Sequence, residues 1–174
     1  DRMTHLFTSL VGRPVKVNHN IFESEKRTAY RNKAIAYLLK HFNVISDDID
    51  GALDLYFKQC SISMNCEDLS MMAATLAHQG VQPRTKENIY SEEIVNQILS
   101  LVFSCGMYDT AGTWSFSVGI PAKSGVSGAM FAVIPGKMGI SCYSPLINEH
   151  GHSIRGVLAI SDLAKLLDYN LFKK

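Results

Sequence analysis

The 174-residue sequence lacks the features that would assign it to several large classes of protein. It has no apolar run of the ~20 residues that a helix needs to cross a bilayer, and residues 1–22 do not have the pattern of a signal peptide. The net charge is only +1, which does not indicate a nucleic-acid partner. There is no internal repeat, low-complexity tract or linker. We therefore expect one globular domain in the cytoplasm, with no membrane and no nucleic acid as partner.

The sequence is also poor in features that would bind a metal or form a redox pair. Its four cysteines include no C-x-x-C pair. Cys60 and Cys105 fall in apolar helical segments, which predicts buried, reduced thiols and an intracellular, reducing compartment. Only His150 and His152 lie close together, in the loop NEHGHS, and the spacing suggests no further ligand. We expect a solvated polar loop there, and no metal or other cofactor.

Helical periodicity dominates the first 106 residues. The segment DRMTHLFTSLVGRP is typical of the end of a helix stopped by Gly12 and Pro14, and a chain that starts inside a helix suggests that something precedes it. Further helices are expected over residues 17–42, 49–62, 65–80 and 91–106. Asn65 and Ser91 are suitable N-caps for the last two.

Individual helix positions carry more specific expectations. The last of these helices should turn four apolar residues to the core, namely Ile94, Ile98, Leu101 and Val102. Tyr56 should lie on or beside a core face, with its ring packed. Glu25 and Asn32 are seven residues apart and share a face if their segment is helical throughout. Periodicity alone favours two solvated polar side chains at these positions.

After Gly106 the period changes from helical to two. Strands are expected over 114–118, 129–134 and 138–142, with a turn at Pro135-Gly136 between the second and third. A final amphipathic helix should begin near Ser153. The predicted order is a cluster of helices, an antiparallel meander and one helix laid on the sheet, which is an α/β fold of the α+β type.

The segment from Cys105 to Val126 concentrates the chemistry. A helix ends at Gly106 and delivers Tyr108, and Lys123, Ser124 and Gly125 follow on the predicted sheet. In acyl transfer the lysine of such a triplet places positive charge beside the substrate. The glycine lets substrate lie against the strand, and the next backbone N–H can donate to an oxyanion. The triplet alone occurs by chance in many proteins, but the CGMYD segment before it makes the pattern more specific.

This layout resembles the second half of a serine β-lactamase or transpeptidase-like fold. Six blocks in order resemble the signature segments of the serine-dependent L-glutaminases: SEKRTAYRN (24–32), LDLYFKQCSI (53–62), MAATLAHQG (72–80), SCGMYDTAG (104–112), VGIPAKSGVSGAM (118–130) and SPLINEHGHSIRG (144–156). The resemblance runs from about Phe22 to Leu167. It implies that residues 1–174 are the C-terminal half of a glutaminase catalytic domain, with a helical part (1–106) and a part of strands plus C-terminal helix (107–174).

The implied reaction is hydrolysis of L-glutamine to L-glutamate and ammonia through an acyl-enzyme. By resemblance, Glu25 and Asn32 match the residues that hold the amino-acid end of the substrate. Tyr56 and Tyr108 match tyrosines beside the nucleophile, which touch substrate and shuttle a proton. An ammonium group favours a nearby phenolate, so a tyrosine beside a lysine suits that role.

The same resemblance assigns the remaining residues of the site. Val126 matches the position whose backbone N–H completes the oxyanion hole, a donor typically worth about 3 to 4 kcal/mol in the barrier. Lys123, Ser124 and Gly125 match the family's K-S-G element and take a supporting role. The implied partners are L-glutamine and further copies of the chain, as a dimer or tetramer.

Two departures from the family pattern stand out. His152 occupies a position where the family more often has Asn, which implies a modest change in the hydrogen bonds of that loop. The family's nucleophile is a serine in an S-x-x-K motif, and no serine of this sequence has a lysine three residues later. The nearest match is Ser24, with Arg27. We therefore expect the nucleophile on a missing N-terminal half of the same domain.

Three hypotheses remain open on the sequence. The first is a glutaminase whose N-terminal half is cut off, removed or on another chain. The second is a non-catalytic half-domain that binds glutamine or a partner protein. The third is a penicillin-interacting amidase or transpeptidase of the same fold, which the lack of an export signal disfavours. An S-x-x-K motif upstream would establish the first.

Overall fold

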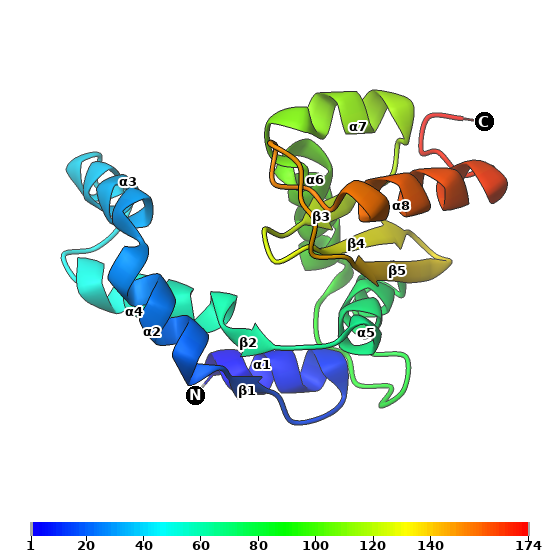
Figure 1. Ribbon diagram of the computed structural model, residues 1–174. Coiled ribbons are helices and arrows are strands. Elements are labelled where there is room, and N and C mark those ends of the chain that lie inside the picture. The colour runs from blue at the N-terminus through cyan, green and yellow to red at the C-terminus, as the bar shows by residue number, and fades with distance from the viewer. Residues whose placement is uncertain (1, 174) are drawn as a thin grey trace. The chain divides into compact units, whose positions relative to one another are not determined.

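The computed structural model describes residues 2–173 (Figure 1). The chain divides into two compact units. Unit 1 comprises residues up to 7 together with 14–64, and unit 2 comprises residues 8–13 together with 65 onward. The expected division at residue 106 stays a prediction. Among the described residues, no helix combines the length and the apolar character that a membrane span requires.

Unit 1 is a small helical body closed by a two-stranded sheet. Its helices after residue 14 are α2 (His19–Thr28), α3 (Tyr30–His41) and α4 (Ile49–Cys60). Strands β1 (Lys16–Val17) and β2 (Ile62–Ser63) pair antiparallel. Lys26 on α2 pairs with Asp54 on α4, with Nζ 2.9 Å from Oδ1. The buried core consists of five side chains, Phe22, Ala29, Ala36, Leu53 and Phe57.

The expected single helix over residues 17–42 is two helices. The backbone of Ala29 has a ψ of 47°, which ends α2 and starts α3. The Thr28 hydroxyl donates to the Ser24 carbonyl at 2.9 Å, a side-chain bond that competes with regular helix geometry. Because the helix is interrupted between them, Glu25 on α2 and Asn32 on α3 do not lie on one continuous helix face.

Unit 2 is built around an antiparallel sheet in the order β3-β4-β5, formed by β3 (Ala122–Ser124), β4 (Ala129–Ile134) and β5 (Met138–Tyr143). Helix α5 (Cys66–Ala77) covers one face and α8 (Ile154–Leu166) the other, as Figure 1 shows. The pleat sends Phe131 and Val133 into the cluster that contains α5. It sends Met130 and Ala132 into the cluster that contains α8. The sheet therefore has a core on each side.

Several predicted boundaries are confirmed. Helix α1 (Arg2–Val11) ends at Gly12, whose φ is +77°. Asn65 caps α5 in a reciprocal capping box with Asp68, and Ser91 caps α6 (Glu92–Cys105). Helix α5 and strand β5 pack closely where both have small residues. A Cβ at Gly139 of β5 would overlap the α5 backbone at Ala74. The last helix starts after Ser153, as expected.

The strand predicted over 114–118 is wrong. This segment lies in helix α7 (Ala111–Ser117). Ala111, Trp114 and Val118 are buried, a spacing of three and then four residues, whereas Phe116 is 91% exposed. The Trp114 Nε1–H donates to the Ile120 carbonyl at 2.8 Å. A five-residue stretch of alternating apolar and polar side chains is compatible with both a strand and a short helix. In the structure the segment is helical, and Trp114 is buried with its indole bonded to the chain that leads into β3.

Two burial predictions are also wrong. On α6 the core face is rotated by one residue from the predicted stripe. Val95 is buried and Ile98 packs against that core, but Ile94 and Leu101 are exposed. Cys60 and Cys105 are exposed as well. Both thiols lie on the solvent side of helices whose overall apolar composition suggested burial.

Candidate functional site

Tyr108 lies beside strand β3 because the end of α6 packs closely against that strand. The Ser124 N–H donates to the Gly106 carbonyl at 3.1 Å, and a Cβ at Gly106 would overlap the Ala122 carbonyl oxygen. Two residues later the chain turns at Tyr108, with a φ of +49°, into the short 3₁₀ helix η1 (Tyr108–Thr110). The Lys123 ammonium then lies 4.2 Å from the centre of the Tyr108 ring.

Gly151 brings three of the predicted residues to one place. The Ser124 hydroxyl donates to the Gly151 carbonyl at 3.4 Å. A Cβ built on Gly151 would lie 3.6 Å from Val126 Cγ1 and 3.7 Å from Tyr108 Cε2. The φ of Gly151 is +81°, a backbone conformation that favours glycine. The loop that contains Gly151 therefore borders Tyr108, Ser124 and Val126 together.

The turn after β3 presents a backbone donor at the surface. Gly125 N–H donates to the Ala129 carbonyl at 2.9 Å, and Gly128 N–H donates to the Gly125 carbonyl at 3.0 Å. Within the described residues the Val126 N–H donates to no protein acceptor, and the residue is 71% exposed. A Cβ at Gly125 would meet only ordinary contacts. Unit 2 itself therefore does not demand a glycine at position 125.

Lys123 and Ser124 are held by the strand that carries them. Ser124 is fully buried, and its hydroxyl already donates to Gly151. The Lys123 ammonium donates to the Ser124 carbonyl. A buried hydroxyl with this partner is poorly placed to attack a substrate, whereas the ammonium stands next to the Tyr108 ring. The geometry fits a supporting role for both residues.

The expectation of a solvated loop around His150 and His152 is wrong for His152. Its side chain is 2% exposed and stacks on the Tyr108 ring, with the ring centres 5.5 Å apart and the planes at 15°. His150 is exposed and pairs with Asp109, at 3.0 Å between Nδ1 and Oδ2. The departure of position 152 from the family pattern indicated only a modest change in loop hydrogen bonds and did not predict this ring contact.

The predicted residues of unit 1 gather partly in a cleft between α3 and α4. Asn32 and Tyr56 line it together with apolar side chains, and its volume is about 320 Å³. Tyr56 lies beside the core as predicted, with its ring centre 5.8 Å from that of the buried Phe57, but it is 47% exposed and its ring is not fully packed. It stands at the cleft. Glu25 is partly buried on α2, and its carboxylate forms no salt bridge with the described residues.

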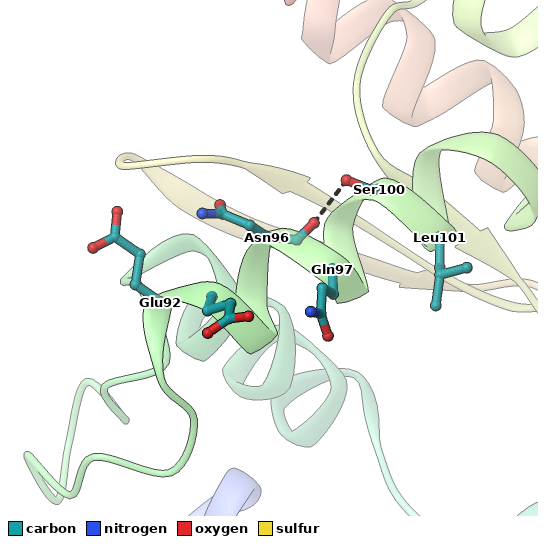
Figure 2. Close-up of a pocket in the computed structure, with 6 residues that line it drawn as sticks. Glu92, Asn96, Gln97, Ser100 and Leu101 are labelled. Atoms are coloured by element: carbon teal, nitrogen blue, oxygen red, sulfur yellow. Dashed lines mark hydrogen bonds between the residues drawn. The ribbon is translucent and has the colours of Figure 1, made fainter.

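A second hollow lies along the outer face of α6 (Figure 2). It is an open depression of about 790 Å³ lined by residues of this one helix, among them Glu92, Asn96 and Ser100. The Ser100 hydroxyl donates to the Asn96 carbonyl of its own helix at 2.8 Å, as the dashed line in Figure 2 marks. None of the predicted site residues lines this hollow. No group of three metal-ligating side chains occurs in the described part of the chain.

Comparison with known proteins gives one consistent result. The family model described as Glutaminase matches residues 1–172. The glutaminase of Trichormus variabilis is 44% identical over 173 residues, which cover 99% of this chain and 52% of that protein. Glutaminase 2 of Clostridium perfringens is 43% identical over 158 residues, covering 91% of this chain and 52% of that protein. The chain thus spans about half the length of these curated relatives.

Solved structures agree with the fold. The probable glutaminase YbaS superposes with a TM-score of 0.96 at 39% identity, covering 99% of this chain and 56% of that one. The Bacillus subtilis glutaminase YbgJ has a TM-score of 0.92 at 32% identity, covering 97% of this chain and 60% of that one. The latter structure is a covalent complex with 5-oxo-L-norleucine, formed by reaction with 6-diazo-5-oxo-L-norleucine. These matches confirm the β-lactamase-like α+β fold expected from the sequence.

Proposed function

The chain belongs to the glutaminase family, and we propose that the protein of which it forms part hydrolyses L-glutamine to L-glutamate and ammonia through a serine acyl-enzyme. The observation that carries the proposal is the grouping of Tyr108 and Val126 beside Gly151, with the Lys123 ammonium over the Tyr108 ring. A phenol beside an ammonium and an unengaged backbone N–H lie together at one surface of unit 2. These are groups that amide hydrolysis requires besides its nucleophile.

In this proposal each group of unit 2 has one task. The Val126 N–H donates to the oxyanion that forms when the side-chain amide of glutamine is attacked. Tyr108 carries a proton between the nucleophile and the leaving ammonia. The Lys123 ammonium, 4.2 Å from the ring centre, places a positive charge beside the ring that carries the proton. Ser124 and Gly125 hold the strand and leave its surface open to substrate.

Unit 1 supplies the recognition of the amino-acid end. Glu25, which forms no salt bridge with described residues, provides a carboxylate for the substrate ammonium. Asn32 provides an amide that both donates and accepts hydrogen bonds. Tyr56 shares the cleft with Asn32 and contacts substrate beside it.

The nucleophile is proposed to lie outside these 174 residues, on a serine of an S-x-x-K motif. No serine of the sequence has a lysine three residues later. The relative YbgJ reacts covalently with 6-diazo-5-oxo-L-norleucine, an amino acid with a reactive diazoketone at its far end. That reaction is consistent with a nucleophile placed at the amide of glutamine. The further partners proposed are the remaining half of the domain and other copies of the protein.

The test is reconstitution of activity from separate pieces. We would assay ammonia release from glutamine by residues 1–174 alone, and again with a folded fragment that carries the S-x-x-K motif. The expected result is no turnover by the chain alone and measurable turnover by the mixture. The matched control is the same fragment with alanine in place of the motif serine, which should restore nothing.

Labelling with 6-diazo-5-oxo-L-norleucine locates the nucleophile independently. Mass spectrometry of the mixture should find the adduct on the motif serine of the added fragment. Turnover by residues 1–174 alone, or an adduct on this chain, would contradict the assignment. If the folded mixture binds glutamine in calorimetry yet releases no ammonia, the non-catalytic binding hypothesis replaces the enzymatic one.

A further inference from the structure

The backbone of His152 is fixed by its own loop, and the ring is held by Tyr108 and Thr110. The His152 N–H donates to the Asn148 side-chain oxygen at 3.0 Å, and the Asn148 N–H donates to the His152 carbonyl at 2.8 Å. The imidazole is buried and stacks on the Tyr108 ring. The Lys123 ammonium lies over the same phenol ring, and the His150 ring centre lies 6.3 Å from that of His152. The orientation of the phenol therefore depends on the orientation of the imidazole.

The hydrogen bonds of Thr110 determine the protonation of His152. The Thr110 hydroxyl donates to the Met107 carbonyl at 2.9 Å, and its oxygen lies 2.8 Å from His152 Nε2. A hydroxyl has one proton, so the second contact requires Nε2–H to donate to Thr110. His152 Nδ1 then carries a lone pair, and it is buried without a hydrogen-bond partner among the described residues.

Burial is the main reason that the ring resists a second proton. Burial lowers the pKa of His152 below its usual value, and His150 and Lys123 lower it further while Asp109 raises it. The depressed pKa means that the unfolded chain binds this proton more readily than the folded chain. The stability of unit 2 should therefore fall as the pH drops below the ordinary histidine value of about 6.5.

We propose that His152 is a positioning residue, which holds the phenol of Tyr108 by ring stacking while it is itself fixed as the neutral Nε2–H tautomer by Thr110. The proposal rests on the role given above to Tyr108. A proton on Nδ1 would place a charged N–H where no acceptor lies, and the ring would have to move to satisfy it. Movement of the imidazole would release the phenol, so acid should disorder Tyr108 before unit 2 unfolds.

Nuclear magnetic resonance on residues 1–174 tests this without any turnover. Nitrogen-15 shifts of the imidazole should report the Nε2–H tautomer and a pKa below about 6.5. The Tyr108 ring protons should be shifted upfield by the stacked imidazole and should titrate with His152. His152→Asn should remove both the upfield shift and the titration. His150→Asn, at the exposed neighbour, should leave the upfield shift in place.

A second variant covers the case in which His152→Asn disturbs the loop. His152→Phe keeps a ring to stack on, so the upfield shift should persist while its pH dependence disappears. In the complete enzyme, His152→Asn should lower kcat by about 10- to 100-fold with little change in KM, because the proton carrier is misplaced. Tyr108 signals that respond neither to pH nor to replacement of His152 would overturn the proposal. If the Tyr108 signals respond to pH and to His152→Asn while the kcat of the His152→Asn enzyme is unchanged, the stacking is supported and the catalytic role of Tyr108 is contradicted.

Discussion

The two units differ in how their apolar side chains are used. Unit 2 places a sheet between α5 and α8 and buries side chains on both of its faces. Unit 1 has one core of five buried residues, and α3 and α4 expose most of their large apolar side chains, namely Tyr30, Ile35, Tyr37, Leu38, Leu39, Leu55 and Tyr56. Because burial of apolar surface drives folding, unit 1 has the smaller stability of its own. The residues proposed for the chemistry lie on unit 2, which has the larger core, and those proposed to recognise the amino-acid end lie on unit 1.

The largest effect that tests this comparison is expected from Phe57→Ala. Phe57 is the largest fully buried side chain of unit 1, at 1% exposed, and its truncation should cost about 3 to 5 kcal/mol of that unit's stability. Hydrogen exchange should show lost protection across α2, α3 and α4, with α5 and β4 still protected. The control is Phe116→Ala in unit 2. Because Phe116 is exposed, this change should alter the free energy of unfolding by less than about 0.5 kcal/mol. Equal loss of protection in both units would show that they fold as one.

A smaller effect is expected from Gly106→Ala in unit 2. The new Cβ would overlap the Ala122 carbonyl oxygen and push the end of α6 away from β3, at a cost of about 1 to 3 kcal/mol. Tyr108 and Lys123 would separate as a result. Gly112→Ala is the matched control, since a Cβ there meets nothing within 4 Å, and in helix α7 it should be neutral or stabilising by up to about 1 kcal/mol. Thermal unfolding of both variants measures the difference. A destabilised Gly112→Ala variant would show that the cost is not specific to the α6–β3 contact.

Local signals predicted much of unit 2 correctly. Asn65 and Ser91 have the side chains that cap helices, and the caps are where the sequence places them. The turn at Pro135-Gly136 joins β4 to β5, with Gly136 at a φ of +72°. These features depend on a few neighbouring residues. The resemblance of ordered sequence blocks then gave the family, which the comparisons confirm.

Other features depend on contacts between distant residues. Trp114 lies in a helix because its ring is buried and its indole N–H reaches the Ile120 carbonyl, which a five-residue pattern does not reveal. His152 is buried because Tyr108 lies 44 residues earlier in the chain and beside it in space. The interruption at Ala29 follows from backbone geometry that alanine does not signal. The assigned roles of Glu25, Asn32 and Tyr56 stay predictions from resemblance.

The most direct test of the account separates kcat from KM in the complete enzyme. Tyr108→Phe keeps the ring and removes the hydroxyl, so kcat should fall by about 10²- to 10⁴-fold with KM little changed. Glu25→Gln removes the charge proposed to hold the substrate ammonium, worth about 1.5 to 3 kcal/mol, so KM should rise at least tenfold while kcat stays within a few-fold. A Tyr108→Phe enzyme with unchanged kcat, or a Glu25→Gln enzyme with unchanged KM, would contradict the division of chemistry and recognition between the two units.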